Sequence, residues 1–431
     1  MNKKVIKFEN IMGVLFALLP IALISGPFFS DLIASIICIY AILNFKKSKI
    51  NFNNIFIKWG LIFYLCFVLN SFLFEYRLES LKNSLPYLRF FLFAVGIKII
   101  LDTDEKYLKY FLYICILSIL IVCFFGFMEH FKYTYQYFQR YIELNNLEHT
   151  DPVREKLKYL YTEFPSRVSG IFQDEKIMGS YLFRLFPLFA ISFFYFNKKL
   201  DNKKLFFFIF ITIIIYFNTF ISGDRAPLIL LSFLLFLIFL VCSNLRKIFG
   251  KIIVIILIIS SATLLFDGKI KERILDQTLR NVTGSYNDGK LTLITKEHQG
   301  HFKAAYIIFK EYPILGAATK GFRNQCYNNL INKEGIVCTN HPHSPYMQLL
   351  SETGILGTLI AIIIFFNLFF KIFIKENLKE NRRSIPLNIV YITLFVSFWP
   401  LTTSGSIFNN YNSVFYYIPL GLLLYLNKKN V

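Results

Sequence analysis

The stretch that decides the fold is LFFFIFITIIIYFNTFISGDRAPLILLSFLLFLIFLVCS, residues 205–243, in which two apolar runs flank a very short turn at Arg225. Each run is long enough for a helix that crosses a membrane. Similar runs recur along the chain, separated by lysine-rich spacers. The composition agrees, because 55% of the 431 residues are hydrophobic and only 17% are charged, whereas about a quarter are charged in a soluble protein. The sequence therefore predicts an all-α, polytopic membrane protein.

Hydropathy and lysine placement together predict about twelve transmembrane helices. The predicted spans are residues 10–26, 29–45, 56–73, 85–101, 107–128, 178–197, 205–221, 226–243, 252–266, 354–371, 386–403 and 413–427. Short lysine-rich connections, such as FKKSK at 45–49 and NKKLDNKK at 197–204, all fit one orientation in which they face the cytoplasm. Both termini are then cytoplasmic. We attribute the net charge of +20 to these lysines, so membrane lipids and not nucleic acid are the expected surroundings.

This orientation predicts one polytopic membrane domain over residues 1–431, with two long outer segments at 129–177 and 267–353. No predicted span contains a histidine. All six histidines fall in the two outer segments: His130, His149, His298, His301, His341 and His343. We therefore expect the outer face to carry the chemistry.

The longer outer segment contains the sequence HFKAAYIIFKEYPILG, residues 301–316, whose apolar residues recur at helical spacing. It predicts an amphipathic helix within the large outer loop. Cys326 and Cys338 follow it, and an oxidising compartment favours a disulfide between them. Closing so short a loop contributes about 3 kcal/mol. The alternative is a zinc site made of both cysteines with His341 and His343, although their spacing does not match the usual zinc signatures.

The sequence HPHSPYMQLLSETGILG, residues 341–357, places His343 at the entrance to a predicted span. Ser344 suits the N-cap of a helix, and Pro345 suits its first position. His343 is then held just outside the helix, between two prolines. Gly354 and Gly357 allow close backbone approach where the loop meets the span.

Several arginines on the outer side are candidates for binding an anion. Arg225 lies in its short turn beside Asp224, which is its simplest partner. Arg167 precedes a span in the stretch FPSRVSGIFQDEKIMGSYL, residues 164–182, and Arg323 adds a cation to the same face. Because a guanidinium group forms paired hydrogen bonds with phosphate oxygens, these residues favour a phosphate or diphosphate ligand.

Four stretches of the chain resemble the O-antigen ligase family. His343 and Ser344, followed by nine residues and then Gly354 and Gly357, are similar to its histidine motif. Arg225 with Ile229 resembles its arginine motif, and EYPILGAATKGFR at 311–323 resembles the run that precedes the histidine. RVSGIFQDEKIMGSYL at 167–182 is also similar. The resemblance covers residues 167–357, and the layout of the spans extends it to the whole chain.

The resemblance implies a metal-independent, inverting glycosyltransferase without a cofactor, at the periplasmic face of the bacterial inner membrane. The implied donor is a glycan on undecaprenyl diphosphate, and the acceptor of the ligases is lipid A–core. Arg225 would bind the diphosphate, and His343 would orient or deprotonate the acceptor hydroxyl. The family carries a second arginine ahead of the amphipathic helix, where His298 and His301 stand here. Arg280 or Arg323 would then supply that charge, alongside Arg167 and His301 as substrate-binding residues.

Other functions remain open at the level of the sequence. O-antigen polymerases and protein O-oligosaccharyltransferases use the same type of donor and differ in their acceptor. A non-enzymatic flippase is a further alternative, but it should carry many charges inside its spans. Here only a few, such as Arg89 and Arg184, lie within the predicted spans, which favours an enzyme.

Overall fold

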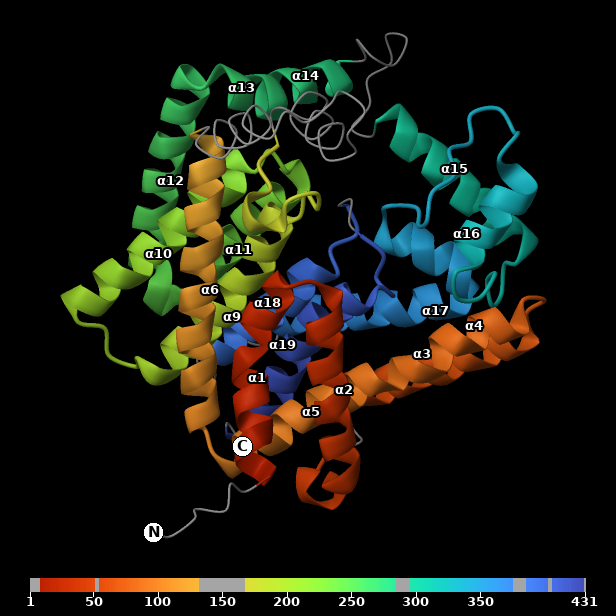
Figure 1. Cartoon of the computed structure of the whole chain (residues 1–431), viewed down its shortest axis with the longest axis horizontal. Helices are drawn as coiled ribbons and strands as arrows, with labels where there is room; N and C mark the ends of the chain where they lie inside the picture. Colours follow the sequence, from red (N-terminus) through yellow and green to blue (C-terminus); the bar gives the residue numbers. More distant parts are fainter. Residues whose placement is uncertain are drawn as a thin grey trace, which may run out of the picture. The chain divides into compact units, whose positions relative to one another are not determined.

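The computed structural model describes residues 8–50, 54–131, 167–283, 295–374, 385–401 and 405–429 (Figure 1). In these ranges every regular element is a helix. Seven stretches are long and apolar enough to cross a membrane: Ile55–Leu73, Arg77–Thr103, Lys106–His130, Met178–Phe196, Asn202–Ile221, Ser243–Phe266 and Pro345–Ile374. Shorter apolar helices include Phe8–Ile24, Pro27–Leu43, Arg225–Val241 and Ile385–Ser397. The prediction of an all-α, polytopic membrane protein is confirmed, and each predicted span overlaps a helix.

The described chain divides into two compact units. The first comprises residues 1–111 and 284–431. Its helices are α1 (Phe8–Ile24), α2 (Pro27–Leu43), α3 (Ile55–Leu73), α4 (Arg77–Ser84), α5 (Leu88–Thr103), α15 (Lys296–Glu311), α16 (Gly321–Gln325), α17 (Pro345–Phe369), α18 (Ile385–Ser397) and α19 (Asn410–Lys429). Helix α5 packs against α2 and α19, and α17 packs against α3 and α15. Arg89 of α5 forms a two-pronged ion pair with Asp31 of α2, which accounts for one of the arginines inside the predicted spans.

The second unit comprises residues 112–283. It contains most of α6 (Lys106–His130) and the helices α9 (Met178–Phe196), α10 (Asn202–Ile221), α11 (Arg225–Val241), α12 (Arg246–Phe266), α13 (Gly268–Ile270) and α14 (Gln277–Val282). Helices α9 to α12 pack on one another, and a π-helical turn, Lys271–Asp276, joins α13 to α14. This turn and α14 belong to the segment that the sequence predicts to lie on the outer face.

Helix α17 is broken at Gly354, which has φ +60° and ψ −160°. The break lets α17 bond with the loop that follows α15: the N–H of Ala317 donates to Ser351 (2.8 Å), and that of Ile355 donates to Pro313 (2.9 Å). Gly316, with φ +76°, lies against the same break, and a Cβ on either glycine would collide with the backbone of the other segment. The two glycines therefore fix α17, and the histidine stretch at its start, against the end of α15.

Candidate functional site

Four histidines of the first unit gather at the starts of two helices. We call His298, His301, His341 and His343 the histidine cluster. The first two lie on α15, and the other two lie just before α17. The ring centroid of His343 is 4.2 Å from that of His341, 5.2 Å from that of His301 and 5.7 Å from that of His298. His343 is therefore surrounded by the other three imidazoles.

Helix caps place these side chains. Thr295 is the N-cap of α15, and its Oγ1 lies 2.7 Å from the Nδ1 of His298. His298 and His301, three residues apart, share one face of α15. Ser344 is the N-cap of α17, and its Oγ accepts a hydrogen bond from the N–H of Met347 (3.4 Å). His343 itself has φ +54°, a conformation that a non-glycine residue adopts only when its surroundings hold it there.

The charge state of the histidine cluster follows from burial and from mutual repulsion. Burial, and after it the charges of His341, His301 and His298 in that order, lower the pKa of His343 to about 4. His343 is therefore a neutral imidazole at neutral pH, with a lone pair that can accept a proton. The Nδ1 of His301 lies 2.8 Å from the carbonyl oxygen of Val337. Because a carbonyl only accepts, Nδ1 carries the hydrogen, and Nε2 is the basic atom of the neutral ring.

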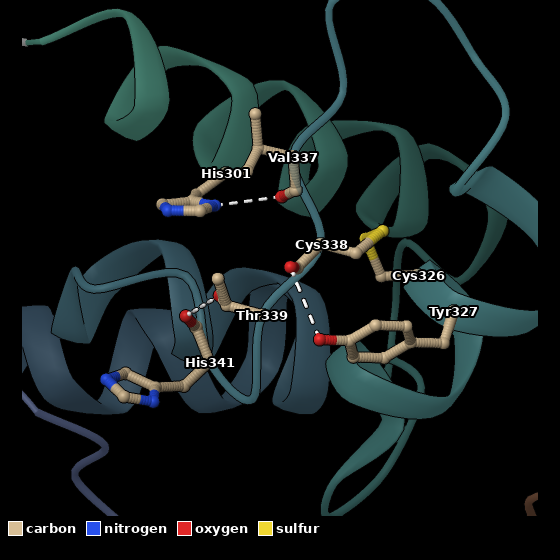
Figure 2. The surroundings of a disulfide bond; sticks show 7 residues. All are labelled: His301, Cys326, Tyr327, Val337, Cys338, Thr339 and His341. Atoms are coloured by element: carbon tan, nitrogen blue, oxygen red, sulfur yellow. Dashed lines mark hydrogen bonds between the residues drawn. A yellow bond between two sulfur atoms is a disulfide. The ribbon is translucent and has the colours of Figure 1, made fainter. Parts of the chain in front are cut away.

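A disulfide between Cys326 and Cys338 lies beside this cluster (Figure 2). The hydroxyl of Tyr327 donates to the carbonyl of Cys338 (3.4 Å), and that of Thr339 donates to the carbonyl of His341 (2.7 Å). The zinc site considered as an alternative needs both thiolates, which the disulfide consumes. Throughout the described ranges, no group of three or more His, Cys, Asp or Glu residues is arranged to hold a metal ion.

The second unit contains a group of cations that we call the arginine cluster, Arg167, Arg225 and Arg273. Arg167 forms an ion pair with Asp224 and donates to the carbonyl of Lys176 (3.0 Å). Arg225, the first residue of α11, donates to Oγ1 of Thr278 (3.1 Å). Arg273, in the π-helical turn, donates through Nε to the carbonyl of Gly223 (3.3 Å) and through Nη1 to Oε1 of Gln277 (2.7 Å). Helix α14 and the turn before it thus lie against the start of α11.

The arginine cluster carries more positive than negative charge. Burial, and after it the charges of Arg225 and Arg167, lower the pKa of Arg273 to about 10, against the opposing effect of Asp224. Burial also raises the pKa of Asp224, although Arg167 opposes this shift. In addition, the Nε of Arg167 is buried without a hydrogen-bond partner in the described structure. Arg167 and Arg273 thus share the Asp224 carboxylate, and Arg225 is repelled by Arg167, so a bound anion would relieve the repulsion among the three cations.

The segment that carries Arg167 is held in place by Glu129, near the end of α6. Its carboxylate accepts hydrogen bonds from the N–H groups of Ser169 (3.0 Å) and Gly170 (2.5 Å). Gly170 has φ +58°, and a Cβ there would lie only 3.1 Å from the backbone nitrogen of Gly126. The RVSG sequence therefore needs its glycine to lie against α6.

Two of the predicted substrate-binding residues lie in these clusters, namely Arg167 beside Arg225 and His301 beside His343. Arg280 instead forms a surface ion pair with Glu272 (3.0 Å), in which both side chains are more than 40% exposed. Arg323 is exposed on α16. Asp224, considered as the partner of Arg225, bonds to Arg167 instead.

Arg273 is the member that the sequence reasoning missed. Its position gave a signal, because Arg273 stands in the outer loop ahead of the amphipathic helix, as the candidate Arg280 does.

A family model described as O-antigen ligase matches residues 207–362, a range that includes Arg225, Arg273 and His343. The match confirms the resemblance to the O-antigen ligase family. It supports an O-antigen ligase or polymerase type of function, which is that of a glycosyltransferase-like membrane enzyme with a lipid-linked glycan donor and an acceptor. A comparison with curated proteins found no match.

Proposed function

We propose that this protein is an O-antigen ligase that moves a glycan from undecaprenyl diphosphate to lipid A–core. The observation that carries the proposal is that a chain matching the family model has both an arginine cluster with excess positive charge and a neutral, half-buried imidazole at His343. The first suits a diphosphate leaving group, and the second suits an acceptor hydroxyl. In this proposal the reaction takes place at the periplasmic face of the bacterial inner membrane, and both termini lie in the cytoplasm.

The arginine cluster would bind the donor diphosphate. Arg225 and Arg273 approach each other from α11 and from the turn before α14, and each has further N–H groups beyond those bonded to protein. The N-terminus of α11 adds a partial positive charge at Arg225. As the bond between the anomeric carbon and the diphosphate oxygen breaks, negative charge grows on the leaving group. Fixed guanidinium groups stabilise that charge without metal or cofactor in this proposal.

His343 would act on the acceptor. Its neutral ring accepts a hydrogen bond from the sugar hydroxyl and aligns that oxygen with the anomeric carbon, on the side opposite the diphosphate. The new C–O bond forms as the old one breaks, which inverts the anomeric centre, and the hydroxyl proton passes to His343. Because its pKa lies near 4, nearly every molecule has the basic form at neutral pH. Orientation is therefore the larger part of its role.

The test is transfer from purified undecaprenyl-diphosphate glycan to lipid A–core, read on a gel. His343→Ala should abolish transfer while donor binding persists, because the imidazole serves the acceptor. Arg225→Ala should weaken donor binding as well, and Arg225→Lys should restore it only in part, because a point charge cannot replace a planar fork. Transfer by His343→Ala at the wild-type rate would contradict the assignment.

Two further experiments separate the ligase from its alternatives and test the orientation. Loss of a ligase should leave full-length glycan on undecaprenyl diphosphate, whereas loss of a polymerase should leave single repeat units. Transfer to protein instead of lipid A–core would identify a protein O-oligosaccharyltransferase. Cysteine labelling from outside the cell should reach a probe at position 290 but not at 200 or 380, and labelling at 380 would reverse the orientation.

A further inference from the structure

We propose that the Cys326–Cys338 disulfide is a positioning element for the histidine cluster, so that glycan transfer requires its oxidised form. The proposal rests on the proposed function, since it concerns the residues that would handle the acceptor. The disulfide acts through the carbonyl of Val337, which holds His301, and through Thr339, which holds the backbone before His343.

The disulfide joins two parts of the first unit. Cys326 is fully buried directly after α16, in a core formed with Ala304, Ala305 and Ile308 of α15. Cys338 lies twelve residues later, in the irregular segment 334–343 that leads to α17. The covalent link therefore ties a segment without regular structure of its own to the packed side of α15.

The residue before Cys338 makes the contact with His301. The carbonyl oxygen of Val337 accepts the Nδ1–H of His301 at 2.8 Å, and His301 is only 5% exposed (Figure 2). Gly300 permits this approach, because a Cβ there would lie 2.6 Å from Cγ2 and 3.0 Å from the backbone nitrogen of Val337. The segment thus lies directly on α15, and it sets both the tautomer and the direction of the His301 ring.

The residues that follow the two cysteines in the sequence add two more contacts. Tyr327, which follows Cys326, donates its hydroxyl to the carbonyl of Cys338 at 3.4 Å. Thr339, which follows Cys338, donates to the carbonyl of His341 at 2.7 Å, two residues before His343 (Figure 2). Two routes of contact therefore lead from the disulfide toward His343. One runs through Val337 to the ring of His301, and the other runs through Thr339 to the backbone at His341.

Loss of the disulfide would release the segment while leaving the helices in place. A dithiol breaks the S–S bond by exchange: the two cysteines gain two electrons and two protons, and the dithiol becomes a cyclic disulfide. His301 would then lose its fixed acceptor, and its ring could change tautomer beside His343. A misplacement of about 1 Å near reacting groups costs roughly 10- to 100-fold in rate. Donor binding should persist, because the arginine cluster consists entirely of residues of the second unit.

The experiment compares the oxidised protein, the dithiol-treated protein and the Cys326→Ser/Cys338→Ser double variant. The kcat for transfer should fall roughly 10- to 100-fold on reduction and recover on reoxidation, while the donor KM stays unchanged. The double variant should be equally slow and insensitive to the dithiol. Cys66→Ser, at a free cysteine of α3 in the same unit, is the matched control and should behave as wild type.

A double-mutant cycle distinguishes positioning from a general staple. If the disulfide acts in part through His301, the losses in kcat from His301→Gln and from reduction should be less than additive, because reduction releases a contact that the variant already lacks. Additive losses, an unchanged kcat after reduction, or parallel loss of donor binding would each overturn the proposal. The proposed function fails separately: wild-type transfer by His343→Ala refutes it, whereas an inactive His343→Ala beside a fully active reduced protein refutes only the positioning role.

Discussion

Arg273 and Arg280 offer a matched pair for testing the arginine cluster, because they lie seven residues apart with opposite surroundings. Arg273 is partly buried beside Arg225 and Arg167, whereas Arg280 pairs with Glu272 at the surface. Replacing each by glutamine removes one positive charge and keeps a hydrogen-bonding side chain. We expect Arg273→Gln to weaken donor binding and Arg280→Gln to leave it unchanged.

The size of the effect follows from the bonds that Arg273 would make. A hydrogen bond to a charged group contributes about 1.5–3 kcal/mol. Losing one such bond to the diphosphate should therefore raise the donor Kd by roughly 10- to 150-fold. The stability should change in the opposite direction. Because burial and the two neighbouring guanidinium groups lower the pKa of Arg273, its charge is disfavoured in the folded protein, and Arg273→Gln should raise the melting temperature.

The assay is binding of undecaprenyl-diphosphate glycan to purified protein in detergent, measured at two salt concentrations. Arg273→Lys should recover part of the affinity, and the loss in Arg273→Gln should shrink at high salt because screening weakens charge interactions. Equal donor affinity of Arg273→Gln and Arg280→Gln would refute the reasoning. So would a large loss in Arg280→Gln alone, since that side chain is exposed and already paired.

Three further predictions concern the stability of the first unit, the pH dependence of transfer and its independence of metal ions. Gly354→Ala should destabilise the protein by roughly 3 kcal/mol, because the conformation at φ +60° and ψ −160° is open essentially to glycine alone; Gly250→Ala in α12, whose Cβ would meet only Phe239 at 3.6 Å, should be tolerated in the same thermal melt. As pH falls, kcat/KM should stay level down to about pH 4, because His343 keeps its basic form until then. Folding stability should instead fall as pH drops below about 6.5, because the unfolded chain binds the proton there and the folded chain does not. A loss of kcat/KM near pH 6.5 would contradict this. EDTA should leave transfer unchanged. A loss of transfer with EDTA that added metal restores would refute a metal-independent reaction.

Hydropathy was sufficient to predict the helices, because burial in a membrane selects the composition of a whole segment. The runs at 205–221 and 226–243 correspond to α10 and α11, with boundaries within a few residues. The cap at Ser344 could also be predicted, since capping depends on neighbouring residues alone. The two glycines also predicted a close backbone approach at Gly354, but not the break in α17 or its partner, the loop at Gly316.

Side-chain partners that are distant in the sequence could not be predicted in this way. Asp224 was assigned to the neighbouring Arg225, but it bonds to Arg167, 57 residues earlier. Arg273 follows the end of α12 by seven residues and reaches the arginine cluster only because a π-helical turn leads to α14. No periodicity in the sequence specifies such a turn. That Arg273, and not Arg280, lies in the arginine cluster could therefore be seen only in the structure.

The proposed reaction explains why the arginine cluster is charged and the ring of His343 is neutral. A departing diphosphate needs fixed positive charge, which three guanidinium groups with one carboxylate provide. An acceptor base must instead be uncharged before it acts. Within the described residues, only burial and three other imidazoles shift the pKa of His343, and both causes lower it. A carboxylate beside it would raise that pKa and fill the lone pair with a proton at neutral pH. Imidazoles can line this cluster because none of them raises the pKa of His343, so its ring stays neutral before it acts.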